Sequence, residues 1–251
     1  MVVHFRGRLG NQLFEYYTAL ALARRIGAEV YFDPHWENQN RLEVRSIVPL
    51  GEASTELLVQ LRGGSSWSGK LKRLLQRLRP LAARSFWIEP GQAFDSRLLR
   101  ARSSCFLDGY WQSYKYFEDL APSEFQPLRS SLAQLASLDR WLDRAREAVV
   151  IHVRLTDYKG TFPILTLDYY RQAMALFPGR RFLVVSDDPA ECQQLFSGIA
   201  GVEVLTDTGR TLWQDLNLMV EAAGVIAANS TFSWWGAYLN PRPEAKVVVP
   251  L

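Results

Sequence analysis

Residues 151–158 place an imidazole, a guanidinium and a carboxylate at the end of an apolar run. The run is typical of a buried strand, and His152, Arg154 and Asp157 stand where that strand should open into a loop. In open α/β sheets, ligands bind beyond the carboxyl ends of the strands. An Arg fork makes paired, charge-assisted hydrogen bonds to phosphate. The segment therefore predicts a site for an anionic ligand, with a solvated strand end as the alternative.

A second candidate site lies near the N-terminus, where a glycine turn at 7–12 joins a strand at 2–5 to a helix. Apolar residues at helical spacing indicate the helix, and Gly27 is suited to end it in a left-handed conformation. Backbone N–H groups and the dipole at a helix N-terminus attract anions. The turn has neither the dinucleotide-binding fingerprint nor the Gly-Lys-Ser/Thr of a P-loop. A tight strand–helix connection is therefore an equal alternative.

A third candidate site is the segment 229–236, which follows a short buried strand at 224–228. Its Ser and Thr hydroxyls are typical helix caps, and the same groups can bind phosphate. Of the paired indoles, we expect one in the core and the other, Trp234, beside a pocket. Another strand end, at 182–188, carries two acids, of which Asp187 is the better ligand candidate and Asp188 the better helix cap.

The motifs resemble those of the bacterial α-1,2-fucosyltransferases and, more loosely, of the α-1,6- and protein O-fucosyltransferases. The likeness runs from Gly7 to about Asn240 and rests on His-x-Arg-x-x-Asp-Tyr at 152–158, Gly-Arg-Leu-Gly-Asn-Gln at 7–12, Gly-Tyr-Trp-Gln at 109–112 and Asn-Ser-Thr-Phe-Ser-Trp-Trp at 229–235. The chain departs from the family in having Leu155 where relatives often carry a second Arg. It is also shorter, so we expect no C-terminal helix that crosses back to the first domain.

The resemblance implies an inverting, metal-independent transfer of L-fucose from GDP-β-L-fucose to the 2-hydroxyl of a terminal galactoside. It assigns catalytic roles to Arg154 and Arg8 at the pyrophosphate, to Asn11 at the fucose or phosphate, and to Asp157 beside Arg154. The other substrate-binding candidates are His152, Tyr158, Gly10, Gln12, Asp187, Asp215, Asn229, Ser230, Thr231, Ser233 and Trp234. The general base is not identified, and the candidates are Asp157, Glu15 and His35. No cofactor is expected besides the donor substrate.

Alternation of strand and helix patterns predicts an α/β fold. In the C-terminal half, a doubly wound parallel sheet is indicated by strands near 148–154, 181–185, 202–205, 224–228 and 246–250 and by helices near 167–177, 189–196, 211–222 and 231–239. The resemblance implies a GT-B-like arrangement of two Rossmann-like domains facing across a cleft. We expect an acceptor-side domain at 1–145, partly irregular, and a more regular GDP-fucose-binding domain at 146–251.

Composition limits the remaining function classes. The chain has 251 residues, of which 48% are apolar, but no apolar run long enough to span a membrane and no signal-peptide pattern. Cys105 and Cys192 stand in apolar surroundings, which predicts buried free thiols and fits a cytoplasmic protein. No Cys/His cluster or Asp-x-Asp is present for a metal. The net charge of +3 is too small to indicate nucleic-acid binding.

One segment, 62–84, carries seven Lys or Arg and no acid, with Leu71, Leu74, Leu75 and Leu78 on one helical face. The favoured interpretation is a solvated helix whose apolar side packs on the core. The alternative is peripheral contact with an anionic membrane, at its inner face, which would suit a lipid-linked acceptor. Three other functions remain open: a fucosyltransferase of α-1,6 or α-1,3 linkage, a non-catalytic GDP-sugar-binding module, and a membrane-docking protein.

Overall fold

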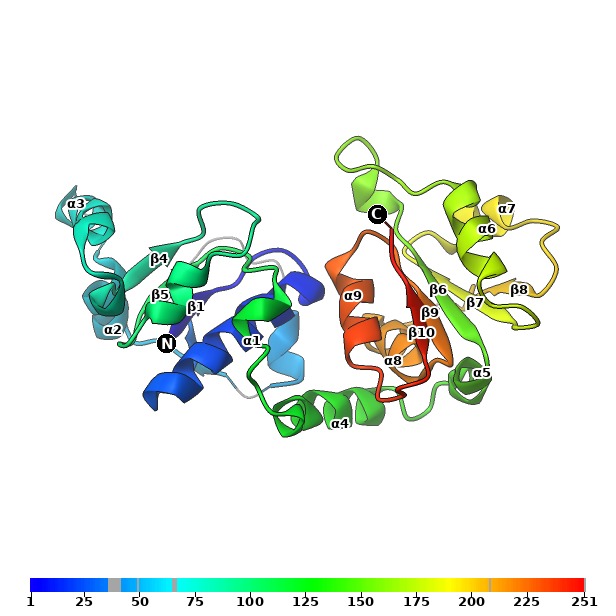
Figure 1. The fold of residues 1–251 in the computed structure, drawn as a ribbon, viewed down its shortest axis with the longest axis horizontal. Helices are drawn as coiled ribbons and strands as arrows, with labels where there is room; N and C mark the ends of the chain where they lie inside the picture. Colours follow the sequence, from blue (N-terminus) through cyan, green and yellow to red (C-terminus); the bar gives the residue numbers. More distant parts are fainter. Residues whose placement is uncertain (36–41, 49, 65–66, 208, 251) are drawn as a thin grey trace. The chain divides into compact units, whose positions relative to one another are not determined.

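The chain folds into two compact units, Met1–Pro127 and Leu128–Leu251, each built on a parallel sheet of five strands (Figure 1). The structure is a computed structural model, and it describes residues 1–35, 42–48, 50–64, 67–207 and 209–250. The α/β class predicted from the sequence is confirmed. In the described part of the chain, no helix has the length and apolar character needed to cross a membrane.

In the first unit, the strand order is β3-β2-β1-β5-β4 and every pair is parallel. The strands are β1 (Val2–His4), β2 (Tyr31–Phe32), β3 (Gly51–Glu52), β4 (Phe86–Ile88) and β5 (Phe106–Asp108). The helices are α1 (Leu9–Ile26), α2 (Thr55–Arg62) and α3 (Trp67–Leu75). Gly27 ends α1 with φ = +67°, as predicted. This unit has more regular structure than its irregular, Arg-, Gly- and Pro-rich sequence indicates.

In the second unit, the strand order is β10-β9-β6-β7-β8, again all parallel. The strands are β6 (Val149–Val153), β7 (Phe182–Ser186), β8 (Val202–Val204), β9 (Gly224–Ile226) and β10 (Lys246–Val248). The helices are α4 (Gln126–Leu135), α5 (Leu142–Glu147), α6 (Leu167–Ala175), α7 (Pro189–Leu195), α8 (Leu212–Glu221) and α9 (Thr231–Tyr238). The predicted alternation of strands and helices is confirmed, with shifts of a few residues at element ends.

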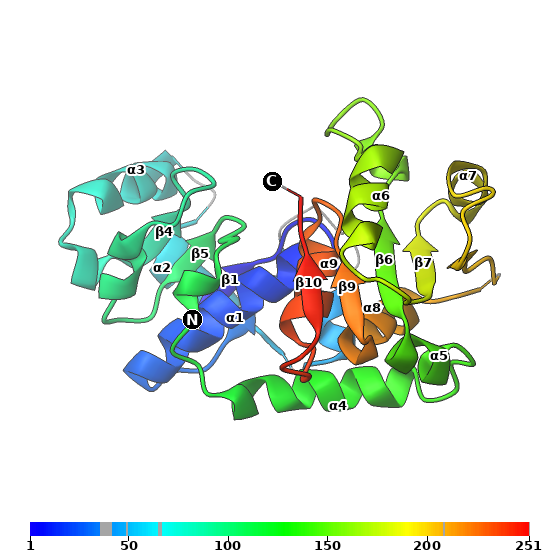
Figure 2. The same ribbon diagram turned by 45° about the vertical axis from the view of Figure 1, so that its right-hand side comes forward.

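Helices cover both faces of the second sheet (Figures 1 and 2). Val149, Ile151 and Val153 of β6 pack with α6 and α7 on one face, whereas α8 and α9 pack together on the other. Every side chain of β6 is buried. A strand buried on both faces explains why its sequence is apolar at every position except His152 instead of alternating.

The two units divide at 127/128, whereas the sequence indicates 145/146. The difference arises because α5, which precedes β6 in the chain, already packs on the second unit. The N–H of Ala223, directly after α8, donates to the carbonyls of Ala145 (3.3 Å) and Ala148 (3.0 Å). The charged composition of 120–146 marks a surface helical region and does not reveal which unit it joins.

Short 3-10 helices connect many of these elements. They are η1 (Glu43–Ser46), η2 (Gln76–Leu78), η3 (Leu81–Ala83), η4 (Ser96–Arg100), η5 (Tyr114–Tyr116), η6 (Pro122–Phe125) and η7 (Thr156–Tyr158). Both cysteines are buried and unpaired, as predicted.

All four sequence motifs follow strands that are neighbours near the middle of their sheets. In the first sheet these strands are β1 and β5, and in the second they are β6 and β9, where the strand order also reverses. Such reversals open a crevice beyond the carboxyl ends of the two strands, which is where ligands bind in doubly wound sheets. Segments 7–12 and 109–112 follow β1 and β5, and segments 154–158 and 229–235 follow β6 and β9.

Candidate active site

Arg154 begins the loop after β6, and acidic side chains hold its guanidinium. Its Nε donates to Asp157 Oδ1 (2.7 Å) and its Nη2 to Asp157 Oδ2 (2.5 Å), while Nε lies 3.4 Å from Asp187 Oδ2. Burial opposes the charge, but the hydrogen bond to Asp157 and the charges of Asp187 and Asp157 outweigh it and raise the pKa of Arg154. Nη1 makes no such bond to the described residues, so it is available to donate to an anion.

Asp187, at the end of β7, holds the Arg154 loop. Its carboxylate accepts the N–H of Leu155 (2.9 Å), the N–H of Thr156 (3.1 Å) and the Thr156 hydroxyl. Although burial raises the pKa of Asp187, these hydrogen bonds and the charge of Arg154 lower it overall. Asp188 caps α7 through the N–H of Glu191 (3.0 Å), as the sequence indicates.

Tyr158 joins the two loops at the reversal of the second sheet. Its hydroxyl donates to the carbonyl of Asn229 (2.8 Å), and the Asn229 side chain donates to the carbonyl of Pro163 (2.9 Å). Ser230 caps α9 by accepting the N–H of Phe232 (3.2 Å). The structure thus brings Arg154, Tyr158, Asn229 and Ser230 to one end of the sheet, with Thr231 in the first turn of α9.

Ser233 and Trp234 of α9, which the sequence predicts as ligand contacts, both contact other groups of the second unit. The Ser233 side chain is fully buried and its hydroxyl donates to the carbonyls of Ala228 (3.2 Å) and Ser230 (3.1 Å), which lie just before α9. Trp235 is the core indole, as predicted, with no exposed surface. Trp234 is half-buried and stacks on Tyr238, with 4.6 Å between ring centroids.

His152 lies inside the second unit, and its ring packs 5.4 Å from that of Phe232. Its Nδ1 is buried without a hydrogen-bond partner among the described residues. Burial, with a smaller effect from the charge of Arg154, lowers the pKa of His152 to about 4. The ring is therefore neutral at pH 7, which favours a packing role over a contact with phosphate.

We expect the His152 ring to remain neutral throughout the mildly acidic range. The folded-state pKa lies below the unfolded value of 6.5, so the stability from the neutral ring is present above that pH and is lost as pH falls towards 4. An NMR titration, with the His152 signal assigned by its absence in His152→Gln, should show no titration step near pH 6.5. A midpoint there would mean that water reaches the ring.

In the first unit, two buried side chains shape the glycine turn after β1. Gln12 donates to the carbonyl of Gly7 (3.0 Å) and accepts the N–H of Val44 (3.1 Å). Both carboxylate oxygens of Glu15 accept the N–H of Arg6 (3.2 and 2.9 Å), and burial raises the pKa of Glu15 well above its usual value. Glu15 is fully buried, so the structure argues against it as the general base. Gln12 likewise supports the loop.

Glycine is required at position 7. Gly7 has φ = +63°, and a Cβ there would lie 2.2 Å from the Asn11 side chain. Next to it, Arg8 is exposed and precedes the first residue of α1, while Gly10 is buried in the first turn. The N–H of Leu9 donates to the Glu43 carboxylate (2.7 Å), so an acid of the protein already occupies one anion-binding donor of this helix.

The loop after β5 lies beside this turn. Gln112 Nε2 donates to Asn11 Oδ1 (2.9 Å), and Arg6 forms an ion pair with Asp108. Trp111 has φ = +52° and is fully buried, an uncommon conformation for a large side chain. Glu89, from the end of β4, stabilises it by accepting the N–H groups of Tyr110 (2.7 Å) and Trp111 (2.9 Å).

Glu43 and Glu89 escaped the sequence analysis, because each is a single acid in an irregular stretch with no motif around it. Asp108 directly precedes the Gly-Tyr-Trp-Gln motif, but the sequence does not show its pairing with Arg6. Only the parallel pairing of β4 with β5, in which Ile88 lies opposite Asp108, places Glu89 next to the loop that it supports. No signal along the chain reports that pairing.

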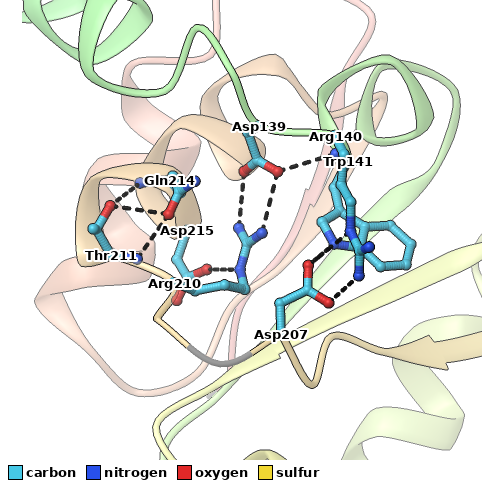
Figure 3. Close-up of polar contacts among 8 residues, drawn as sticks. All are labelled: Asp139, Arg140, Trp141, Asp207, Arg210, Thr211, Gln214 and Asp215. Carbon is cyan, nitrogen blue, oxygen red and sulfur yellow. Dashed lines mark hydrogen bonds and ion pairs between the residues drawn. The ribbon is translucent and has the colours of Figure 1, made fainter.

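Asp215 belongs to a charged cluster that joins α8 to the loop before α5 (Figure 3). It accepts Arg210 Nε (2.9 Å), and Arg210 also donates to both carboxylate oxygens of Asp139 (3.2 and 3.0 Å). Thr211 and Gln214 cap α8 by a reciprocal capping box. Burial raises the pKa of Asp215. These contacts place Asp215 in a charged cluster of the second unit, and its contact with a nucleotide stays a prediction.

His35, the third base candidate, is exposed and lies 3.8 Å from Asp33, whose other oxygen accepts from Arg62 (2.5 Å). Residues 36–41, which follow it, are outside the described part of the chain. Within the described residues, no group of three or more His, Cys, Asp or Glu side chains is placed to hold a metal ion.

Comparison with known proteins identifies the family. A family model described as glycosyl transferase family 11 matches residues 70–250. The chain belongs to glycosyl transferase family 11. The resemblance to the α-1,2-fucosyltransferases stated from the motifs is thereby confirmed, and this family 11 chain is a glycosyltransferase.

Two relatives of this family 11 chain are named for α-1,2 transfer. The α-1,2-colitosyltransferase of Escherichia coli is 24% identical, over 100% of this chain and 91% of its own length. The human galactoside α-(1,2)-fucosyltransferase 1 is 27% identical over 94% of this chain and 64% of its own length. The family 11 chain therefore matches under two thirds of the length of the galactoside fucosyltransferases.

A solved structure supports the fold. The structure of a mutant of Arabidopsis thaliana FUT1 in complex with GDP matches this family 11 chain with a TM-score of 0.57 and 12% sequence identity. The match includes 99% of this chain and 69% of the FUT1 chain. The fold of two Rossmann-like units is GT-B-like, as the resemblance implied.

Proposed function

We propose that this chain transfers L-fucose from GDP-β-L-fucose to the 2-hydroxyl of a terminal galactoside, with inversion and without a metal ion. The observation that carries the proposal is the position of Arg154 at the strand-order reversal of the second sheet, joined to the α9 loop through Tyr158 and Asn229. The α-1,2 transfer named for the relatives supports the linkage.

The chemical demand of this reaction is the leaving group. GDP departs with growing negative charge on its β-phosphate, and fixed positive charge near that oxygen lowers the barrier. Asp157 and Asp187 hold the Arg154 side chain, of which 16% is exposed, so little reorganisation is needed when the donor binds. Nη1 would bind phosphate, with the first turn of α9 and its Ser230 and Thr231 hydroxyls as further donors.

We assign the first unit to the fucose and the acceptor. Asn11 and Gln112, which follow the neighbouring strands β1 and β5, are joined by a hydrogen bond, and Arg8 is exposed three residues before Asn11. Asn11 would orient the fucose or a phosphate, and Arg8 would add positive charge. Of the base candidates, burial argues against Glu15, while Asp157 has an exposed carboxylate next to Arg154.

Colitosyl transfer is the second candidate, favoured by the relative from Escherichia coli, which matches this chain over its whole length. Colitose is fucose without its 3-hydroxyl, so the two donors share GDP and differ in one hydrogen-bonding group. A site that hydrogen-bonds the 3-hydroxyl rejects the sugar that lacks it, whereas an apolar site discriminates weakly. The two functions are therefore separated by the donor used.

The test is mass spectrometry of the products formed from lactose and either GDP-fucose or GDP-colitose, in the presence of EDTA. We expect a deoxyhexose on lactose from GDP-fucose, and an α-1,2 linkage by NMR of the product. Addition only with magnesium would refute metal independence. Transfer of colitose with no transfer of fucose would favour the second candidate. Binding of GDP-fucose without turnover on lactose or N-acetyllactosamine would favour a binding module.

A further inference from the structure

The helix α3 and the following η2 are attached to the first unit by their polar face. Lys72 Nζ donates to the carbonyls of Val59 (3.2 Å) and Gln60 (2.7 Å), near the C-terminal end of α2. Arg73 Nη1 donates to the carbonyls of Arg62 (3.3 Å) and Gly64 (3.2 Å). Cations are favoured at this end of a helix, where carbonyl groups lack intrahelical partners. The inward side of α3 is therefore cationic.

Close backbone packing and an amide continue this attachment. Gly69 lies against Gly64 so closely that a Cβ would stand 1.9 Å from the Gly64 carbonyl oxygen. About two turns further along, Gln76 donates to Ser85 Oγ (3.0 Å) and accepts the Ser85 N–H (3.1 Å). The row 69, 72, 73 and 76 is one helical face, and it consists of a glycine and three polar side chains.

The apolar side chains consequently face away from the unit. The outward face consists of Trp67, Leu71, Leu74, Leu75 and Leu78, with exposed fractions of 77%, 39%, 60%, 48% and 82%. This is the reverse of the orientation favoured from the sequence, in which the leucines pack on the core. Single exposed apolar residues are ordinary, but a contiguous group of five on one helical surface marks a contact site.

The charges around the outward face select its partner. Residues 62–84 carry no acid and seven Lys or Arg, of which Lys72 and Arg73 are on the inward side and Arg62 pairs with Asp33. Lys70 and Arg79 are exposed, and Arg102, also exposed, lies beside this segment through a hydrogen bond from its N–H to the Ala82 carbonyl (3.3 Å). A symmetric dimer through this face would place equal basic groups opposite each other, which is unfavourable. An anionic lipid surface accepts both the leucines and the cations.

We propose that the outward face of α3–η2 docks this protein on membranes that contain anionic phospholipid. Trp67 and the leucines enter the boundary between headgroups and acyl chains, while Lys70 and Arg79 contact the headgroup phosphates. The contact is peripheral and independent of the donor and acceptor sites, so it can be measured without either substrate.

The test is co-sedimentation of the full chain with vesicles of phosphatidylcholine alone or with about one third phosphatidylglycerol. We expect binding to the anionic vesicles and weaker binding as salt is raised. The double variant Leu74→Gln, Leu78→Gln should bind at least about tenfold more weakly, since each leucine loses its apolar burial. Lys70→Gln, Arg79→Gln should lose the preference for anionic vesicles.

The matched control is Leu138→Gln, Leu176→Gln, which replaces two exposed leucines of the second unit, 96% and 51% exposed. It should bind vesicles as the unaltered chain does, and circular dichroism should show all variants folded. Absence of vesicle binding by the unaltered chain would overturn the proposal. Equal vesicle binding by the Leu74→Gln, Leu78→Gln variant and the unaltered chain would also overturn it. The same holds if the unaltered chain does not bind vesicles but forms a dimer by light scattering that this variant abolishes.

Discussion

Replacement of Arg154 by alanine is expected to lower kcat/KM for fucosyl transfer by about 1,000-fold, which corresponds to about 4 kcal/mol of transition-state stabilisation. The loss follows from the removal of the guanidinium held at the end of β6 by Asp157 and Asp187. The charge on the departing GDP grows most in the transition state, so kcat should fall more than the affinity for GDP-fucose. Initial rates and calorimetric titration with GDP separate the two effects.

The control for this measurement is Arg171→Ala. Arg171 lies on α6 of the same unit, 59% exposed, with its nearest carboxylate 4.0 Å away. It should retain normal activity. Arg154→Lys should recover part of the lost rate, because an ammonium restores the charge without the planar fork. An Arg154→Ala protein that is folded by circular dichroism and turns over at a near-normal rate would contradict the role assigned to this residue.

Replacement of Asp139 by alanine is expected to destabilise the second unit by about 3 kcal/mol. Asp139, with 1% of its side chain exposed, accepts two hydrogen bonds from Arg210, which is 11% exposed, and also the N–H of Trp141 (3.0 Å) (Figure 3). Without Asp139, Arg210 keeps only its contact with Asp215 among the described residues, so its buried charge is less well compensated. Urea denaturation, with hydrogen exchange followed in peptides from α5 and α8, measures the loss.

An exposed ion pair in the same unit supplies the comparison. Asp143 is 92% exposed and lies 3.0 Å from Arg146, and its replacement by alanine should change the free energy of unfolding by less than about 0.5 kcal/mol. Equal effects of the two replacements would mean that the Asp139–Arg210 contact contributes no more than a surface pair. Faster exchange throughout the first unit in Asp139→Ala would contradict its assignment to the second.

The second sheet was predictable because its local signals agree with one another. Strand β6 is apolar except at His152, Asp188 is followed by Pro189 at the start of α7, and Thr211 and Gln214 stand three residues apart at the start of α8. These three elements carry their own local signals. In the first unit, the strand that the sequence indicates at 30–32 is present as β2, whereas β3 is a strand of two residues in an irregular stretch and leaves no periodicity to recognise.

The site residues also divide into those whose position local sequence signals reveal and those whose partners only the fold reveals. Arg154, Asn229 and Ser230 were predicted from a strand end and a helix start, and the pairing of β6 with β9 brings their loops together. Asp187, Gln12 and Ser233 have the types expected of ligands, yet in the structure they hold backbone groups. Residue type reports hydrogen-bonding capacity, whereas the partner depends on neighbours distant in sequence.

The amino-acid sequence by itself determined the α/β class, the strand–helix alternation of the second half, the motifs and the family resemblance that they carry. These depend on residue type and spacing along the chain. Only the tertiary structure decided that Glu89 supports the Trp111 turn, that Glu15 is buried, and that Leu74 and Leu78 face outward. Helical spacing shows that Leu74 and Leu78 share a face with each other. Which face turns inward depends on the α2 carbonyls that bind Lys72, and that contact exists only after folding.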